Sequence, residues 1–254
     1  MNHSTFVSPS TGRKVKAILF DTFGTVVDWR TGVAREARMF ADKHGLTMEP
    51  FDLADTWRAR YYPSMAPIRS GDRGYVPLDQ LHFENLKTAL AELGLPPSEF
   101  PDDDLLELTR AWERLPAWPD SVEGLKRMKA RYIVGPLSNA NTALLVSMAK
   151  SAGLPWDVVI GMDLLQVYKP DPAAYTGAAA LLRLHPGEIM LAAAHNYDLQ
   201  AARETGMATA FVRRATEHGP EQTTDLAPAS DWDICVEDFT QLAQSLSAEP
   251  AATA

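Results

Sequence analysis

Four short segments of this 254-residue chain gather polar residues at the ends of predicted strands and helices. They supply carboxylates, an ammonium group, hydroxyls, an amide and an imidazole, and they are Asp21-Thr22-Phe23-Gly24-Thr25, Ser138-Asn139, Lys169-Pro170-Asp171 and His195-Asn196-Tyr197-Asp198. An ionised aspartate can attack carbon and form an ester, provided that a nearby cation keeps it ionised. Asp21 is the candidate nucleophile and Lys169 the candidate cation. A single aspartate at a strand end is usually a turn or cap residue, so only the joint pattern indicates a site.

The elements that must position these residues alternate between strand and helix. Strands are expected at 15–20, 132–137, 156–160, 188–194, 209–212 and 233–236, and helices at 141–152, 172–182, 197–205 and 239–247. Such alternation builds a parallel sheet with helices on both faces, and ligands bind beyond the carboxyl ends of its strands. The sequence therefore predicts an α/β fold with a Rossmann-like parallel sheet core that brings the four segments to one edge.

Residues 30–115 interrupt this alternation. They contain four predicted helices, at 30–44, 51–61, 78–93 and 103–115, and no convincing strand. Pro116 and Pro119 stop the last of these helices and mark the return to the strand–helix pattern. We therefore expect a catalytic core made of residues 14–29 and 116–247, a helical cap insert at 30–115, and flexible tails at 1–13 and 248–254.

Composition and charge exclude several classes of partner. With 33 acidic and 24 basic residues the formal charge is -9, and basic residues form no long run, so nucleic acid is not expected as a partner. The single cysteine, Cys235, cannot form an internal disulfide, which suits a reducing compartment. The apolar run at 15–20 is too short for a signal peptide or a membrane span. We expect a soluble cytoplasmic protein with no membrane partner.

The four segments, in this order, resemble the motifs of the haloacid dehalogenase superfamily. Residues 18–25 resemble its first motif, 137–139 its second, Lys169-Pro170 its third and the stretch ending at Asp198 its fourth. Most of the superfamily are magnesium-dependent phosphatases, which carry a second aspartate two residues after the nucleophile and an acid four residues before the last motif aspartate. Phe23 and Ala194 stand at those two positions here, so Asp21 and Asp198 alone are a poor set of magnesium ligands.

These departures fit the type II (L-2-haloacid) dehalogenase branch, which has an aromatic residue at the Phe23 position and uses no metal. Residues 166–175, with Lys169 and Tyr175, also resemble that branch, and Trp57-Arg58 resembles the place of its substrate-binding arginine. The resemblance implies metal-independent hydrolysis of short 2-haloalkanoic acids through an aspartyl ester, with a small haloacid as substrate and without a cofactor. Related dehalogenases are commonly dimers, which makes a homodimer one expectation.

The resemblance also assigns roles to individual residues. The expected catalytic residues are Asp21, Lys169, Asp198, Thr25, Asn139 and His195, the expected substrate-binding residues are Ser138, Arg58, Phe23, Thr22 and Tyr175, and no metal ligands are expected. Asp198, with Thr25 and Asn139 nearby in the family arrangement, would orient or deprotonate the water that hydrolyses the ester. Ser138 and backbone N–H groups around Phe23 and Asn139 would hold the substrate carboxylate.

His195 departs from the branch itself, whose well-known members have an asparagine there, in a Ser-Ser-Asn-Ala-Trp-Asp-like stretch. This chain reads Ala-Ala-His-Asn-Tyr-Asp at 193–198 and so loses two hydroxyls and gains an imidazole. Fluoride is a poor leaving group that needs strong donors, so His195 with Arg58 suggests that fluoroacetate is accepted as well as chloroacetate. The alternatives are a strand-end histidine without a role and, for the whole chain, a magnesium-dependent phosphatase of the same fold or a catalytically silent binding domain.

Overall fold

The computed structural model describes residues 5–247 and is built around a six-stranded parallel sheet. Its strands are β1 (Ala17–Phe20), β2 (Ile133–Ser138), β3 (Ile160–Gly161), β4 (Ile189–Ala193), β5 (Ala208–Val212) and β6 (Ile234–Val236). They lie in the order β3-β2-β1-β4-β5-β6, and every pairing is parallel, which confirms the expected α/β class. Because the strand order reverses between β1 and β4, a crevice forms beyond the carboxyl ends of these two strands.

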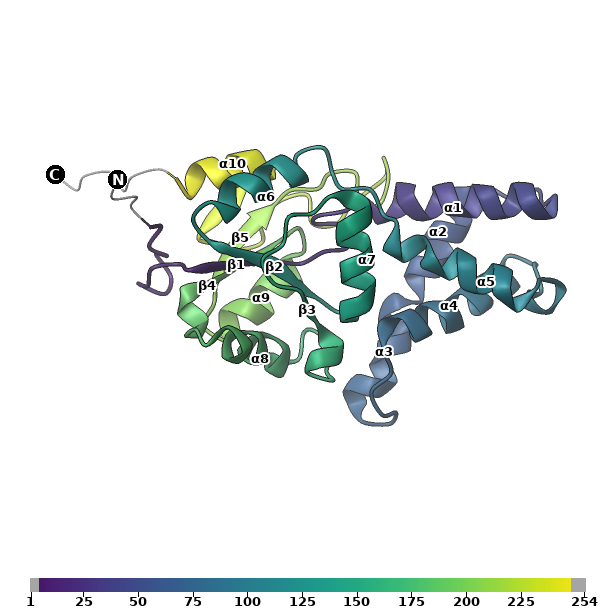
Figure 1. Cartoon of the computed structure of the whole chain (residues 1–254), viewed down its shortest axis with the longest axis horizontal. Coiled ribbons are helices and arrows are strands. Elements are labelled where there is room, and N and C mark those ends of the chain that lie inside the picture. The colour runs from purple at the N-terminus through teal and green to yellow at the C-terminus, as the bar shows by residue number, and fades with distance from the viewer. Residues whose placement is uncertain (1–4, 248–254) are drawn as a thin grey trace.

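Helices cover both faces of this sheet (Figure 1). α6 (Ser121–Lys129) and α10 (Phe239–Ser245) lie on one side, α8 (Pro172–Leu182) and α9 (Asn196–Glu204) on the other, and α7 (Thr142–Ala152) contacts β3. The sequence does not predict α6, because Gly124 weakens its helical pattern. The fold requires that glycine, since a Cβ there would lie 2.4 Å from the Cβ of Phe239 in α10.

A second group of helices lies beyond the carboxyl end of β1 (Figure 1). It consists of α1 (Trp29–His44), α2 (Pro50–Ala59), α3 (Tyr61–Ser70), α4 (Leu78–Glu92) and α5 (Asp102–Thr109), with short 3-10 turns at Pro97–Glu99 and Arg110–Glu113. Helix α1 begins after Asp28, whose carboxylate accepts a hydrogen bond from the backbone N–H of Thr31. The sequence does not predict α3, because Pro63 and Pro67 disrupt its helical pattern.

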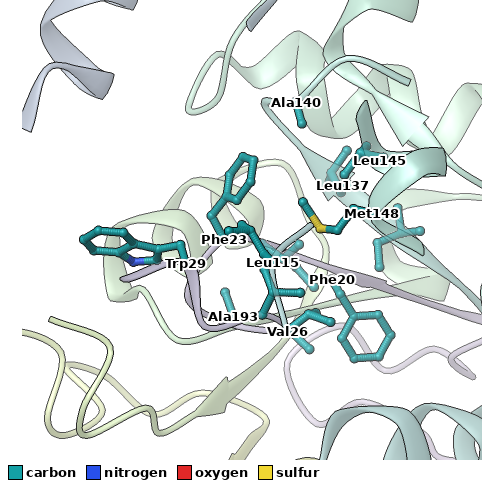
Figure 2. Close-up of a cluster of buried hydrophobic side chains, with 14 of the residues drawn as sticks. Phe20, Phe23, Val26, Trp29, Leu115, Leu137, Ala140, Leu145, Met148 and Ala193 are labelled. Atoms are coloured by element: carbon teal, nitrogen blue, oxygen red, sulfur yellow. The ribbon is translucent and has the colours of Figure 1, made fainter. Parts of the chain in front are cut away.

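The hydrophobic core lies between the sheet and its helices. Figure 2 shows Leu137 of β2 close to Leu145 and Met148 of α7, with Phe23 and Trp29 set apart from them. All five side chains are buried. Truncating such a buried leucine to alanine typically costs about 2–5 kcal/mol of stability, so this packing holds the strand ends firmly. Phe23 and Trp29 instead both pack against Trp112, where the core meets the second group of helices.

Two sequence expectations differ from the structure. Residues 5–13, expected as part of a flexible tail, are held against the core: Ser8 is fully buried and its hydroxyl donates to Asp233, 2.7 Å away. The strand expected at 156–160 begins only at Ile160 and ends at Gly161. Asp157, before it, instead accepts a hydrogen bond on its side chain from the backbone N–H of Val134 in β2. Residues 1–4 and 248–254, the rest of the expected tails, lie outside the described residues.

Every helix within residues 5–247 falls short of the length and apolar character that a membrane span requires.

Candidate active site

Asp21 stands at the centre of the crevice, directly after the last residue of β1. Its backbone N–H donates to the carbonyl of Ala192 in β4, so the strand pairing continues through it and fixes its direction. The residue is 7% exposed. One carboxylate oxygen, Oδ1, accepts a hydrogen bond from Lys169 Nζ at 2.9 Å, and the other, Oδ2, accepts one from the Thr25 hydroxyl at 2.8 Å. Thr25 is held in turn by the backbone N–H of Ala194.

Lys169 places its ammonium group between two carboxylates. Its Nζ lies 2.9 Å from Asp21 Oδ1 and 2.5 Å from Asp198 Oδ2, and the residue is 2% exposed. Burial alone would lower the pKa of Lys169, but the two carboxylates outweigh it and raise that pKa well above its usual value. The backbone N–H of Lys169 donates to the side chain of Asn139, which positions it.

Asp21 is correspondingly kept ionised. Burial would raise the pKa of Asp21, but the charge of Lys169 and the hydrogen bond and charge of His195 hold it far below its ordinary value. A buried carboxylate that stays ionised, with cations rather than water around it, is a strong candidate for a nucleophile.

Asp198 is the second carboxylate that Lys169 binds. It lies in the first turn of α9, is fully buried, and accepts a hydrogen bond from the Tyr175 hydroxyl of α8 at 2.5 Å. Burial raises the pKa of Asp198, and the negative charge of Asp21 raises it further, although Lys169 opposes this. Such a carboxylate is a better proton acceptor than an exposed aspartate.

His195 contacts the carboxylate oxygen of Asp21 that Lys169 does not bind. Its Nδ1 lies 3.0 Å from Asp21 Oδ2, and its Nε2 lies 2.9 Å from Oε2 of Glu217. Burial would lower the pKa of His195, but the charge of Glu217 and the hydrogen bond to Asp21 raise it well above its ordinary value. Both carboxylate partners therefore favour the protonated form of the ring.

Glu217 is the residue of this site that the sequence analysis misses. It is 1% exposed, lies in the segment after β5, and also accepts a hydrogen bond from Trp29 Nε1 at 3.0 Å. Burial would raise the pKa of Glu217, but His195 lowers it below its ordinary value. Glu217 comes five residues after the end of a predicted strand, so the criterion that selected the other four segments gives only a weak signal for it.

Arg58 brings a further positive charge from α2. Its guanidinium carbon lies 4.1 Å from the ring centroid of Tyr61 and 5.3 Å from that of Trp29. One of its nitrogens, Nη1, is buried and has no hydrogen-bond partner within residues 5–247. A cavity of about 480 Å³ is lined by Arg58, His195, Tyr62, Tyr197, Trp29, two further residues of α2 and three of the segment after β5. An unpaired guanidinium N–H at a cavity wall favours an anionic ligand.

The structure brings together seven of the sequence-predicted site residues through direct hydrogen bonds, which are Asp21, Thr25, Asn139, Lys169, Tyr175, His195 and Asp198. Phe23 is buried and packs edge-on against Trp112, and Arg58 lies 5.9 Å from the Phe23 ring. Ser138 and Thr22 make no such link to the nucleophile in the described chain. The Ser138 hydroxyl accepts from the backbone N–H of Ala140, and the buried Thr22 hydroxyl is unpartnered.

These residues do not fit a magnesium ion. The ammonium group of Lys169 already lies between the two carboxylates that a cation would need. Phe23 and Ala194 offer no side-chain oxygen. Across residues 5–247, three or more histidine, cysteine, aspartate or glutamate side chains nowhere gather in a way that could hold a metal ion.

Comparison with known proteins gives consistent matches. The sequence model of the haloacid dehalogenase-like hydrolase family matches residues 15–206. (S)-2-haloacid dehalogenase 4A of Burkholderia cepacia is 32% identical over 203 residues, which cover 79% of this chain and 84% of that protein. The crystal structure of the defluorinating L-2-haloacid dehalogenase Rha0230 is 58% identical, with a TM-score of 0.96, and covers 96% of this chain and 100% of that one. The structure of another L-2-haloacid dehalogenase is 44% identical, with a TM-score of 0.89, and covers 92% of this chain and 100% of that one.

Proposed function

Because this chain belongs to the haloacid dehalogenase-like hydrolases, and within them to the 2-haloacid dehalogenases, we propose that Asp21 displaces halide from short 2-haloalkanoic acids. The protein is a hydrolase acting on carbon–halide bonds. The proposed reaction uses no metal ion and passes through an ester of Asp21. The observation that carries this proposal is the ion pair between Lys169 and Asp21, which presents an ionised carboxylate beside a cation.

The first step is a single displacement at carbon 2 of the substrate. A carboxylate oxygen of Asp21 forms a bond to that carbon as the carbon–halogen bond breaks, and halide leaves with the bonding electron pair. The configuration at that carbon is therefore inverted. Arg58 attracts the anions involved, and the hydroxyls of Ser138 and Thr22 with nearby backbone N–H groups hold the substrate carboxylate. The buried, unpartnered Thr22 hydroxyl supports this role, since it has a hydrogen bond still to make.

The second step is hydrolysis of the ester. Asp198 accepts a proton from a water molecule, which attacks the Cγ of Asp21, and the bond from Cγ to the substrate oxygen then breaks to release the 2-hydroxy acid. Thr25 and Asn139 fix the surrounding geometry through their bonds to Asp21 and Lys169. The substrate carbon is untouched in this step, so the inversion is preserved.

Fluoroacetate is part of the proposed substrate range. Fluoride leaves only when developing negative charge is well stabilised. Arg58 and His195 line the same cavity, and His195 contacts the nucleophile. The similarity to a structure described as a defluorinating L-2-haloacid dehalogenase, at 58% identity, supports this range.

We also propose that residues 30–115 act as a cap over a core made of 14–29 and 116–247. Arg58 and Tyr62 from this block line the same cavity as His195 and Tyr197 from the core. The hydroxyls of Tyr62 and Tyr197 share a hydrogen bond across the join. Substrate size is then set by the space between the two parts.

The test is halide release from chloro-, bromo- and fluoroacetate and from both 2-chloropropionate enantiomers, with EDTA present. We expect release that EDTA does not reduce and that D21N abolishes. The same preparations are assayed with an aryl phosphate and added magnesium. Phosphate release that depends on magnesium would identify the alternative phosphatase, and absence of both activities would indicate a binding domain.

A further inference from the structure

The two ring nitrogens of His195 both face carboxylate oxygens. Nδ1 lies 3.0 Å from Asp21 Oδ2, and Nε2 lies 2.9 and 3.1 Å from the two oxygens of Glu217. An ionised carboxylate only accepts hydrogen bonds, and a neutral imidazole has a proton on one nitrogen alone. A neutral ring would therefore turn a lone pair toward one of the two carboxylates, whereas the imidazolium satisfies both.

We propose that Glu217 is a positioning residue that keeps His195 as an imidazolium, and that the Nδ1–H of this ring stabilises the oxyanion formed during hydrolysis of the Asp21 ester. This inference rests on the proposed function, since it concerns the second step of that reaction. It assigns His195 an electrostatic role in place of proton abstraction from water, because a ring that is already doubly protonated cannot accept a proton.

The two carboxylate oxygens of Asp21 have different numbers of hydrogen-bond partners, and this difference indicates which oxygen attacks the substrate. Within the described chain Oδ2 accepts from Thr25 at 2.8 Å and faces His195, whereas Oδ1 accepts only from Lys169. The less engaged oxygen, Oδ1, is the one that attacks the substrate. Oδ2 then becomes the carbonyl oxygen of the ester, with the Thr25 hydroxyl and the His195 imidazolium already within hydrogen-bond distance.

The electron balance of the step follows from this geometry. When water attacks Cγ, the π electron pair of the Cγ–Oδ2 bond moves onto Oδ2, and the water proton passes to Asp198. When that pair returns, the bond from Cγ to Oδ1 breaks, and Oδ1 leaves as the hydroxyl oxygen of the 2-hydroxy acid, which takes the proton from Asp198. Asp21, left as the neutral acid with the water oxygen, then loses its remaining proton to solvent and is again a carboxylate. His195 keeps both of its protons throughout and acts only as a donor.

The surroundings of His195 support a permanent charge on it. The titratable and charged groups that face it or its two carboxylate partners are Asp21, Glu217, Lys169, Asp198, Arg58, His218, Tyr62 and Tyr197. Two carboxylates are in direct contact with the ring, and the ammonium group of Lys169 is bonded to one of them, Asp21. Burial of Glu217 removes the water that would otherwise screen its attraction for the ring.

The fold makes specific room for Glu217. A Cβ at Gly24 would lie 2.0 Å from Glu217 Oε1, and the φ of +87° at this position favours glycine as well. Trp29 donates its indole N–H to the same carboxylate. The carboxylate is thus held from the first turn after β1 and from α1 at a fixed distance from His195.

The first experiment measures the charge of the ring in the resting enzyme, without substrate. Protein labelled with 15N-histidine is titrated by NMR, and the His195 signals are identified among those of the six histidines by comparison with H195Q. We expect a doubly protonated His195 at pH 8 in the wild type. In E217Q the glutamine amide can donate to Nε2 and permits a neutral ring, so the ring should lose its proton at lower pH. E221Q, an exposed neighbour on the same segment, is the matched control and should behave as the wild type.

The second experiment measures hydrolysis of the ester in single turnovers with chloroacetate. We expect E217Q to hydrolyse the ester about 10–100-fold more slowly than the wild type at pH 9, where its His195 is neutral, and nearly normally at pH 6. E217D keeps the negative charge and should largely restore the pH profile. A loss in E217Q that is equal at both pH values would indicate a merely structural role and overturn the inference.

The outcomes separate this inference from the function on which it rests. No halide release by the wild type from any haloacid overturns both. Normal halide release together with a neutral His195 at pH 8 overturns the inference alone. Halide release with a charged His195 and the expected pH-dependent ester accumulation in E217Q supports both.

Discussion

Lys169 Nζ lies 2.9 Å from Asp21 Oδ1, and both side chains are almost completely withdrawn from water. Removing two charges from water costs desolvation free energy, which additional hydrogen bonds offset here. Lys169 also bonds Asp198, and Thr25 and His195 contact the second oxygen of Asp21. A nucleophile held in this way is ionised before the substrate arrives. The same arrangement makes each partner strongly dependent on the other.

Replacing Lys169 by methionine should therefore damage both activity and stability. K169M keeps the apolar stem and leaves two carboxylates facing each other without a cation, so we expect halide release to fall by at least about 10³-fold. Breaking one side of a buried ion pair typically costs about 3–5 kcal/mol, which urea unfolding at pH 7 would reveal. K43M removes an exposed lysine that pairs with Asp104 and should cost less than about 1 kcal/mol. Equal stability of K169M and the wild type at pH 7 would contradict the expected ionisation.

A covalent step at Asp21 predicts isotope transfer into its side chain. After a single turnover in 18O-labelled water, mass spectrometry of the peptide that contains Asp21 should show one added label, because water attacks Cγ of the ester. D21N should release no halide, and D72N, an exposed aspartate in the loop after α3, should keep full activity. Label found only in the product would mean that water attacks the substrate directly.

The residues that follow strand ends could be predicted from the sequence because topology alone gathers them. Asp21 and His195 follow neighbouring parallel strands, so their side chains meet in the crevice whatever the details of the loops. Lys169 was predicted by chemistry as well, since an anionic nucleophile for an anionic substrate needs a cation. These three positions depend on the fold class and on residue charge, and both can be recognised from short stretches of the sequence.

Glu217 could not be placed in the same way. It comes five residues after β5, in an irregular segment whose path is set by contacts with distant residues such as Trp29 and Gly24. The sequence does not predict helix α6 for a related reason. Its Gly124 is required by close packing against Phe239, although glycine has a low helix propensity. In both cases tertiary contact decides what the local sequence leaves open.

The charge proposed for His195 predicts a distinct pH dependence of stability. Its pKa is raised well above the unfolded value of 6.5, so the folded state keeps a proton that the unfolded chain loses as the pH rises through 6.5. The resulting stabilisation is fully present below pH 6.5 and disappears as the pH rises to the folded-state pKa. We expect the free energy of unfolding of the wild type to fall over that interval with a slope approaching about 1.4 kcal/mol per pH unit.

H195Q tests this dependence directly, because glutamine does not titrate. Urea unfolding between pH 6 and 9 should give a flatter profile for H195Q than for the wild type. H185Q, at an exposed position far from the nucleophile in sequence, should keep the wild-type slope. Parallel profiles for H195Q and the wild type would show that the ring is neutral in the folded protein.

Arg58 predicts a change in substrate capture with little change in stability. Its Nη1 is buried at a cavity wall without a hydrogen-bond partner in the described residues, so its planar guanidinium is free to bind an anion through paired N–H groups. R58K keeps the charge and loses that paired geometry, and we expect kcat/KM for chloroacetate to fall about 10–100-fold, mainly through KM. R60K is the matched control two residues on, where the arginine pairs with Glu92 on the surface, and it should leave kinetics unchanged.

Because the departure of fluoride depends most on donors that stabilise the leaving anion, the loss of kcat/KM in R58K should be greater for fluoroacetate than for bromoacetate. An equal loss for both halides would assign Arg58 to the substrate carboxylate alone.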